Sequence, residues 1–251
     1  MALREVVPAA TAPLVLKEPG GRDVLLSTLL PMSWPGMVRR DGRAFLALQV
    51  ANRSGDASRD LAAVLQEVLV AEPGTTVAPV ELPGPGPRLQ DLLDDAPLEV
   101  TLHAGFDHWV EGMPDDDGEL AASLERANGG VVPTARLESV HSAYWCRMRE
   151  RAHLRWVLPE DEEPLLDGLA RLAVTGGLSL GDGTRYVGSF RAHGLLVPVW
   201  DLPADLPAEA LDGPAAALRS RLDEALSETG PLTADQRRAR SGLLSRQLTL
   251  R

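Results

Sequence analysis

The chain contains short apolar segments of strand length and longer segments in which apolar residues recur with the spacing of a helix. Their order does not follow the regular strand–helix–strand repeat of a parallel α/β fold. Strand-like apolar runs lie at 11–17, 23–30 and 44–50, and two hairpins follow later, one of them within 140–159. Short turns join antiparallel strands, whereas parallel strands need long crossovers. The sequence therefore predicts an α+β fold with mainly antiparallel sheets built from hairpins, and with packing helices between them.

Helices are predicted where apolar residues recur every three or four positions. The clearest is 57–72, in which Leu61, Val64 and Leu65 begin the apolar face and Pro73-Gly74 ends the pattern. Further helices are predicted near 120–127, 161–174 and 213–228. A last helix is predicted to begin at the capping box formed by Thr233 and Gln236.

A proline- and glycine-rich segment suggests a boundary between two lobes. Residues 81–88 contain three prolines and two glycines, which makes a stiff connector. We predict an N-terminal α+β lobe (1–80), a connector (81–97) and a C-terminal α+β lobe (98–251), the two lobes packing as one globular unit. A weak likeness between DGRAFLALQV and HGLLVPVWDL, each followed by a helix, leaves open that the lobes are similar.

Charge and composition exclude several classes of function. The net charge is −11, so nucleic acid is not the expected partner. Lys17 is the single lysine and follows no phosphate-binding loop, which argues against P-loop hydrolases, kinases and Schiff-base enzymes. No apolar run is long enough to span a membrane, the N-terminus does not read as a secretory signal, and Cys146 has no second cysteine to pair with. We expect a soluble protein of the reducing cytoplasm.

The stretch VHSAYWCRMRERAHLRWVLP (140–159) reads as a hairpin whose loop length decides which side chains share a face. A four-residue loop mixes charge into both faces. A loop of three or five residues puts Tyr144, Cys146, Met148, Leu154, Trp156 and Leu158 on one face, and Trp145, Arg147, Arg149, His153, Arg155 and Val157 on the other. We therefore expect an odd loop, with Cys146 buried among apolar neighbours and slow to react.

The second of these faces is the candidate binding site. Forked arginine donors beside an aromatic ring suit a small anionic ligand or a protein partner. The candidate residues are Trp145, Arg147, Arg149, His153 and Arg155. The alternative is that Glu150 and the acidic run at 160–163 neutralise these arginines as surface ion pairs of little consequence.

Other polar clusters carry weaker predictions. His103, Asp107, His108 and Glu111 are metal-ligand types, but their spacing matches no known ligand pattern, so we predict no metal and no cofactor. Ser189 has His193 nearby without a GxSxG motif, and His193-Gly194 suits a tight turn. A hydrolase that uses His103, Asp107 and His108, or Ser189 and His193, is the alternative to a binding or adaptor protein.

Four segments resemble a family of uncharacterised actinobacterial proteins grouped as a domain of unknown function: YWCRMRERAHLRWVLPEDEE, GSFRAHGLLVPVWDLP, SGDASRDLAAVLQ and ARSGLLSRQLTLR. The resemblance runs over essentially the whole chain and implies a single full-length globular unit. Some members carry a label that links them to the preprotein translocase SecA through its SEC-C zinc motif, which a chain with one cysteine cannot form. Members often have a basic extension before the point where this chain begins. The resemblance implies no catalytic or binding residue.

Overall fold

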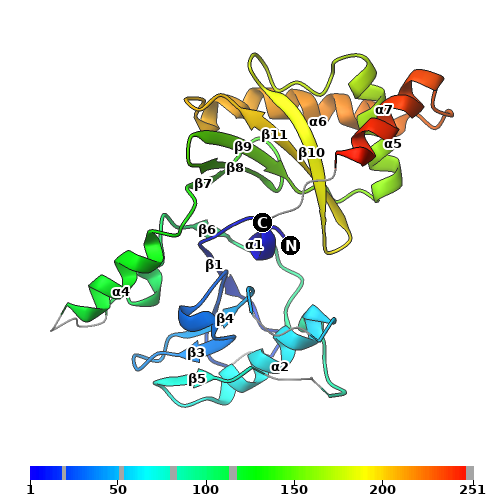
Figure 1. Cartoon of the computed structure of the whole chain (residues 1–251). Helices are drawn as coiled ribbons and strands as arrows, with labels where there is room; N and C mark the ends of the chain where they lie inside the picture. Colours follow the sequence, from blue (N-terminus) through cyan, green and yellow to red (C-terminus); the bar gives the residue numbers. More distant parts are fainter. Residues whose placement is uncertain (19–20, 51–53, 80–83, 113–117, 247–251) are drawn as a thin grey trace. The chain divides into compact units, whose positions relative to one another are not determined.

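The computed structural model describes residues 1–18, 21–50, 54–79, 84–112 and 118–246, and the chain divides into two compact units (Figure 1). The N-terminal unit is Leu3–Val131. The C-terminal unit is Val132–Arg251 together with Met1 and Ala2. Within the described residues, no helix is long and apolar enough to cross a membrane.

The N-terminal unit is built on a six-stranded sheet, called here the first sheet, with the order β5-β3-β4-β2-β1-β6. Its strands pair antiparallel except for β2 and β4, which run parallel. The strands are β1 (Ala10–Leu14), β2 (Val24–Ser27), β3 (Gly36–Val38), β4 (Ala44–Ala47), β5 (Thr75–Val77) and β6 (Thr101–Leu102). The helices of this part of the chain are α1 (Ala2–Glu5), α2 (Ala57–Val70), α3 (Leu89–Leu92) and α4 (Glu119–Asn128), with 3-10 turns at Pro31–Ser33 and Asp107–Trp109.

Helix α2 packs closely on the first sheet, as its apolar spacing predicts. Asp56 caps the helix by accepting a hydrogen bond from the backbone N–H of Arg59, and Val64 and Val68 are among its buried residues. At Gly36 of β3 a Cβ atom would lie 2.5 Å from Cγ2 of Val68. Only glycine therefore allows α2 to approach β3 this closely.

The C-terminal unit is built on a five-stranded antiparallel sheet, the second sheet, with the order β10-β11-β9-β8-β7. Its strands are β7 (Thr134–Arg136), β8 (Ala143–Met148), β9 (Arg151–Trp156), β10 (Arg185–Ala192) and β11 (Leu195–Leu202). Its helices are α5 (Glu162–Val174), α6 (Asp212–Ser227) and α7 (Ala234–Ser245), preceded by a 3-10 turn at Ala208–Leu211. The predicted capping box of Thr233 and Gln236 begins α7, and the predicted turn at His193-Gly194 joins β10 to β11 with positive φ angles of 50° and 80°.

One face of the second sheet, called the inner face, is covered by the helices of the same unit (Figure 1). Leu154, Trp156 and Trp200 on this face are at most 1% exposed and belong to one apolar cluster with residues of α5, α6 and α7. Full burial of such side chains contributes roughly 1.5–3 kcal/mol each. The opposite side of the sheet, called the outer face, carries the remaining half of each strand's side chains.

The hairpin of β8 and β9 corrects the predicted register. Its loop has two residues, Arg149 and Glu150, because Met148 pairs with Arg151 and Cys146 with His153. The predicted odd loop is therefore wrong, and with it the predicted segregation of faces. Trp145 shares the inner face with Leu154 and Trp156, and Met148 is 39% exposed rather than in the core.

The fold class is as predicted, since the two sheets are mostly antiparallel and helices are interspersed between the strands. The division into units lies elsewhere than the expected connector at 81–97, of which 81–83 is outside the described residues. Thr101 and Leu102 pair with Thr11 and Ala10 of β1, which places 98–131 in the N-terminal unit. The two sheets also differ in strand order, so any likeness between the halves does not extend to topology.

We expect Gly36→Ala to destabilise the protein by about 1–3 kcal/mol, because its methyl group would overlap Val68. Gly213→Ala in α6 is the matched control, since a Cβ there meets nothing within 4 Å. The control should be neutral or stabilising by up to about 1 kcal/mol. Urea denaturation of the two variants measures the difference, and equal stabilities would contradict the close approach of α2 to β3.

Candidate functional site

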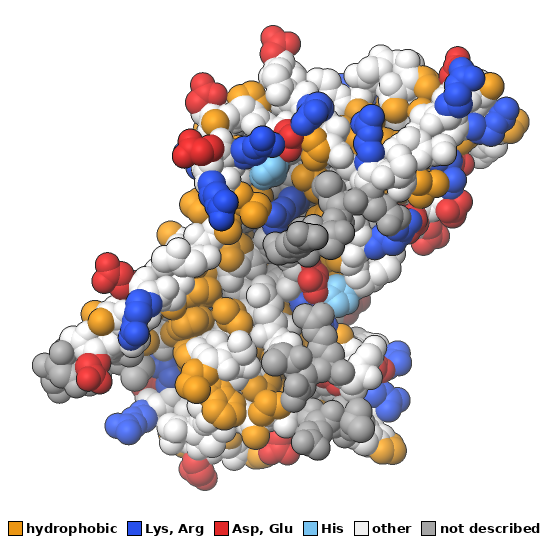
Figure 2. All heavy atoms as spheres, viewed as in Figure 1, with side chains coloured by type: hydrophobic (Ala, Val, Ile, Leu, Met, Phe, Trp, Pro, Cys, Tyr) orange, Lys and Arg blue, Asp and Glu red, His pale blue; other side chains and the backbone are white. Residues whose placement is uncertain are grey.

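The outer face of the second sheet carries a group of basic side chains on neighbouring strands. Cross-strand pairing aligns Arg136 with Tyr144 and Tyr144 with Arg155, while Cys146 pairs with His153. His153 pairs in turn with Asp201, and Asp201 with Arg185. We call Arg136, Arg151, His153, Arg155 and Arg185 the cationic face. Figure 2 shows basic side chains gathered around a histidine over the part of the molecule where Figure 1 has the second sheet.

The structure separates the five residues that the sequence predicted to lie together. His153 and Arg155 are on the outer face. Trp145 and Arg147 belong to the inner face, where the Arg147 guanidinium lies 5.2 Å from the Trp145 ring centroid. Both are held by carbonyl oxygens of the segment before α6: Trp145 Nε1 donates to Leu206 and Arg147 Nη2 to Ala204. Arg149 lies in the turn with a φ of 57°.

Sequence reasoning missed three members of the cationic face, Arg136, Arg151 and Arg185. Arg151 fell in the assumed loop, and β7, which carries Arg136, is only three residues long. A two-residue hairpin loop is the commonest kind, and counting the alternation from that loop places Arg151 beside His153 and Arg155. The sequence therefore contains the information needed to find Arg151. The separation of charged from apolar side chains favoured a loop with an odd number of residues, whereas the loop has an even number.

Several arginines of this region lack the carboxylate partners that many arginines elsewhere in the described chain have. Arg136, Arg149 and Arg151 make no ion pair or side-chain hydrogen bond to any described residue, and Arg155 Nη2 donates to the Met148 sulfur, a weak acceptor, at 3.0 Å. The acidic run that was expected to neutralise them pairs with other arginines: Glu160 with Arg219, Glu162 with Arg191 and Glu163 with Arg240. The cationic face is therefore not neutralised by that run.

One carboxylate does lie within the cationic face. Asp201 has Oδ1 at 3.1 Å from Nδ1 of His153 and Oδ2 at 2.9 Å from Nη2 of Arg185. Asp201 thereby holds Arg185 in place at one end of the face and lies beside His153, whose buried Nδ1 makes no hydrogen bond of normal geometry. On the same side of β9, Arg151 is exposed and Arg155 is partly buried, and neither has a carboxylate partner among the described residues.

Two weakly polar side chains are buried beside these arginines. Cys146 is 1% exposed, and burial raises the pKa of its thiol, an effect that the positive charge of Arg155 offsets in part. Burial likewise raises the pKa of Tyr144, with Arg136 acting in the opposite direction. Burial of Cys146 is as predicted, although it lies on the outer face rather than among Leu154 and Trp156.

Two of the four metal-ligand types singled out in the sequence, His103 and His108, form a stacked pair. The rings of His103 and His108 stack with centroids 4.5 Å apart. Burial, reinforced by His103, lowers the pKa of His108 to about 4, and burial also lowers the pKa of His103. Among the residues that the structure describes, no three His, Cys, Asp or Glu side chains come together as metal ligands.

Neither predicted hydrolase site has the geometry of a nucleophile next to a base. His108 Nε2 lies 3.3 Å from Oγ of Ser27, but Ser27 is fully buried and donates its own proton to the Leu29 carbonyl oxygen. Ser189 is 3% exposed in β10, and His193 lies in the turn that follows this strand. A reacting serine needs access to its substrate, which these two serines lack.

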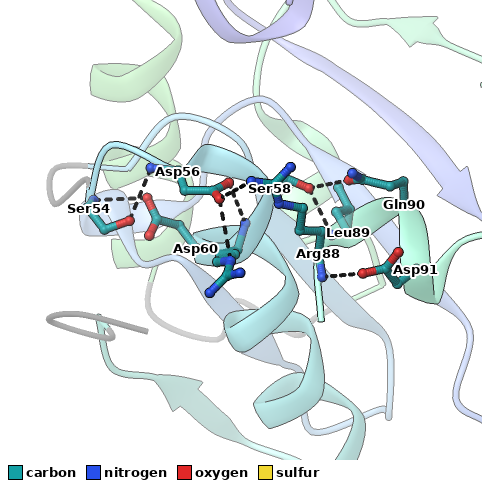
Figure 3. Close-up of polar contacts among 9 residues, drawn as sticks. Ser54, Asp56, Ser58, Asp60, Arg88, Leu89, Gln90 and Asp91 are labelled. Carbon is teal, nitrogen blue, oxygen red and sulfur yellow. Dashed lines mark hydrogen bonds and ion pairs between the residues drawn. The ribbon is translucent and has the colours of Figure 1, made fainter. Parts of the chain in front are cut away.

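A pocket of about 480 Å³ lies in the N-terminal unit beside the start of α2. Its polar residues bond mostly to one another: Ser58 Oγ accepts from the backbone N–H of Leu89 and donates to Gln90 Oε1, and Lys17 Nζ donates to the Gln90 carbonyl oxygen. Figure 3 shows this network continuing through Arg88, which donates to Asp56 at 2.9 Å. The network joins α3 to α2 and accounts structurally for most of the polar atoms around the pocket.

We expect the thiol of Cys146 to react slowly in the native protein, because it is buried and its pKa is raised. A disulfide reagent such as dithionitrobenzoate should label it only on the timescale of unfolding, and within seconds in urea. Stoichiometric labelling of native protein within minutes at neutral pH would show that the outer face is open at this position.

The lowered pKa of His108 predicts a loss of stability in acid. Unfolded His108 takes up a proton near pH 6.5 but the folded form only near pH 4, so the unfolded state binds more protons across this window. The stability present above pH 6.5 should fall by about 1–3 kcal/mol as the pH drops to 4. His108→Gln should remove this part of the pH dependence in denaturation curves, whereas His141→Gln, at an exposed position, should leave it in place. An unchanged slope in His108→Gln would contradict the assignment.

Comparison with known proteins assigns the chain to a family. No curated protein and no solved structure matches the chain. The model of one family, described as a family of unknown function (DUF5926), matches residues 1–251. The chain therefore belongs to this family of unknown function, as the resemblance of its sequence motifs indicates.

Proposed function

We propose that the protein is a cytoplasmic binding protein that holds an acidic segment of a partner protein on the cationic face. The observation that carries this proposal is the contrast between its arginines. Many arginines elsewhere in the described chain are engaged in ion pairs, whereas Arg136, Arg151 and Arg155 have no carboxylate partner within it.

Charge supports an anionic partner. Unpaired like charges on neighbouring strands repel one another, and a net charge of −11 makes such a concentration of positive charge unusual for this chain. Guanidinium groups bind carboxylates through two parallel hydrogen bonds. An acidic ligand would supply the partners that the protein itself does not provide.

The spacing along β9 favours an extended peptide. Arg151, His153 and Arg155 project from the same side of the strand at intervals of two residues, which is roughly 6.6–6.8 Å. An extended segment with Glu or Asp at every second position has the same repeat. The proposed partner is therefore a protein segment with alternating acidic residues, rather than nucleic acid, which the net charge of the chain disfavours.

The hydrolase alternative has less support. Its two candidate sites use the buried Ser189 and the stacked pair of His103 and His108. Neither places a nucleophile where a substrate would reach it, so no specific observation favours this alternative.

The proposal is tested with a fluorescent twelve-residue peptide of alternating Glu and Ser, whose binding to the whole chain is followed by fluorescence anisotropy. We expect the triple variant Arg136→Gln, Arg151→Gln, Arg155→Gln to weaken binding by about tenfold or more, since each charge-assisted hydrogen bond contributes about 1.5–3 kcal/mol. Its melting temperature should change little, because Arg136 and Arg151 are exposed, where substitutions cost within about 0.5 kcal/mol each, and the partly buried Arg155 loses only a weak bond to the Met148 sulfur.

A matched variant removes three arginines from other surfaces: Arg59→Gln, Arg126→Gln and Arg237→Gln. It has the same net charge as the first variant and should retain binding. Equal losses in the two variants would mean that attraction is diffuse rather than local, and would overturn the proposal. Tighter binding of an oligonucleotide of equal charge would overturn the choice of a protein segment.

A further inference from the structure

A second pocket, of about 510 Å³, lies on the helix-covered side of the C-terminal unit. Its walls come from the end of α5, from β10 and from α7, three elements that Figure 1 shows close together. Leu178 and Leu243 belong to the buried apolar cluster, and Ala173 and Ala239 pack against it. The volume is in the range of small-molecule sites, and the apolar walls suit a hydrocarbon or aromatic body.

The hydroxyl of Tyr186 is a polar group in this otherwise apolar wall. Its side chain is 7% exposed and packs edge-on against Trp200, with ring centroids 5.5 Å apart. The hydroxyl is buried and has no hydrogen bond of normal geometry to any described residue. Leaving such a group unpaired costs free energy, so the pocket holds a donor in need of an acceptor.

Positive charge lies at the same pocket. Arg246 lines it, and its side chain makes no ion pair or hydrogen bond within the described part of the chain. Arg238 also lines it, and among the described residues it pairs with the exposed Asp235 one turn earlier in α7. Burial raises the pKa of Tyr186, an effect offset in part by side-chain hydrogen bonding from Ser189, which leaves the Tyr186 O–H free to donate, and by the charge of Arg246. The tyrosine is therefore a protonated donor at neutral pH.

We propose that this pocket binds a small organic acid with an apolar body. The carboxylate accepts a hydrogen bond from the Tyr186 hydroxyl and pairs with Arg246, while the apolar body lies against Leu178 and Leu243. The site is on the inner side of the second sheet and shares no residue with the cationic face, so it does not depend on the function proposed above.

The test uses decanoate as the acid and decan-1-ol as the neutral control, titrated into the whole chain by calorimetry. We expect saturable binding of one decanoate, with decan-1-ol binding at least about tenfold more weakly because it lacks the charge. Arg246→Gln should weaken decanoate binding by about tenfold. Arg237→Gln, in α7 but outside the pocket, should leave it unchanged.

Tyr186→Phe distinguishes a ligand-binding hydroxyl from a structural one. Removal of an unpaired hydroxyl should leave the melting temperature unchanged or raise it, while weakening decanoate binding about fivefold or more. Tyr144→Phe, the same change at the only other tyrosine, should not affect binding. A marked loss of stability in Tyr186→Phe would mean that the hydroxyl has a structural role, and would overturn the proposal.

Gly242 offers a way to close the pocket without disturbing the fold. It lines the pocket from α7, and a Cβ built there meets nothing within 4 Å. Gly242→Leu should therefore fold, with a helix at least as stable, and should abolish decanoate binding. Undiminished binding in this variant, no saturable binding by the wild type, or equal affinity for decanoate and decan-1-ol would each overturn the proposal.

Discussion

The hairpin of β8 and β9 turns over two residues, and this turn determines the side of the second sheet on which each of its side chains lies. Successive strand residues point to opposite faces, so a shift of one residue would exchange the two sets. Burial decides between the registers. Trp145, Leu154 and Trp156 reach the helix-covered side together only with a loop of even length, such as this one. Burial of each contributes a few kcal/mol, whereas an exposed ion pair contributes less than about 1 kcal/mol. The arginines of β9 therefore lie on the opposite, outer face of the sheet.

This ordering of energies explains why charge accumulates on the outer face. An acidic chain has ample carboxylates to neutralise its arginines, and α5 alone pairs with Arg191 and Arg240 through its first turns. The same acids do not pair with Arg151 and Arg155. Unneutralised charge on a folded surface does little for stability, because exposed pairs are worth little either way. Such a patch is therefore better understood through what it can bind.

The sequence predicted what depends on local periodicity and missed what depends on distant pairing. Helix α2, the capping box at Thr233 and the turn at His193-Gly194 follow from short patterns whose physical cause lies within a few residues. The pairing of Thr101 with Thr11 does not, since it joins segments 90 residues apart, and it moves the boundary between the units away from the proline-rich connector. The face of Trp145 was missed for another reason. Separating charged from apolar residues assumes that only one face is buried, whereas Tyr144 and Cys146 are buried on the outer face as well.

The two pockets differ in a way that volume alone does not convey. Around Ser58 the polar atoms are donors and acceptors to one another, so a ligand there would have to compete with bonds that already exist. At Tyr186 a buried hydroxyl has no partner of normal geometry in the described chain, and Arg246 beside it has no counter-ion there. The free energy needed to remove the Tyr186 hydroxyl from water is the same whether or not a ligand binds later. Folding has already removed this hydroxyl from water. A ligand that supplies an acceptor therefore gains the hydrogen bond without the desolvation penalty on the protein side, which makes the less satisfied pocket the better binding site.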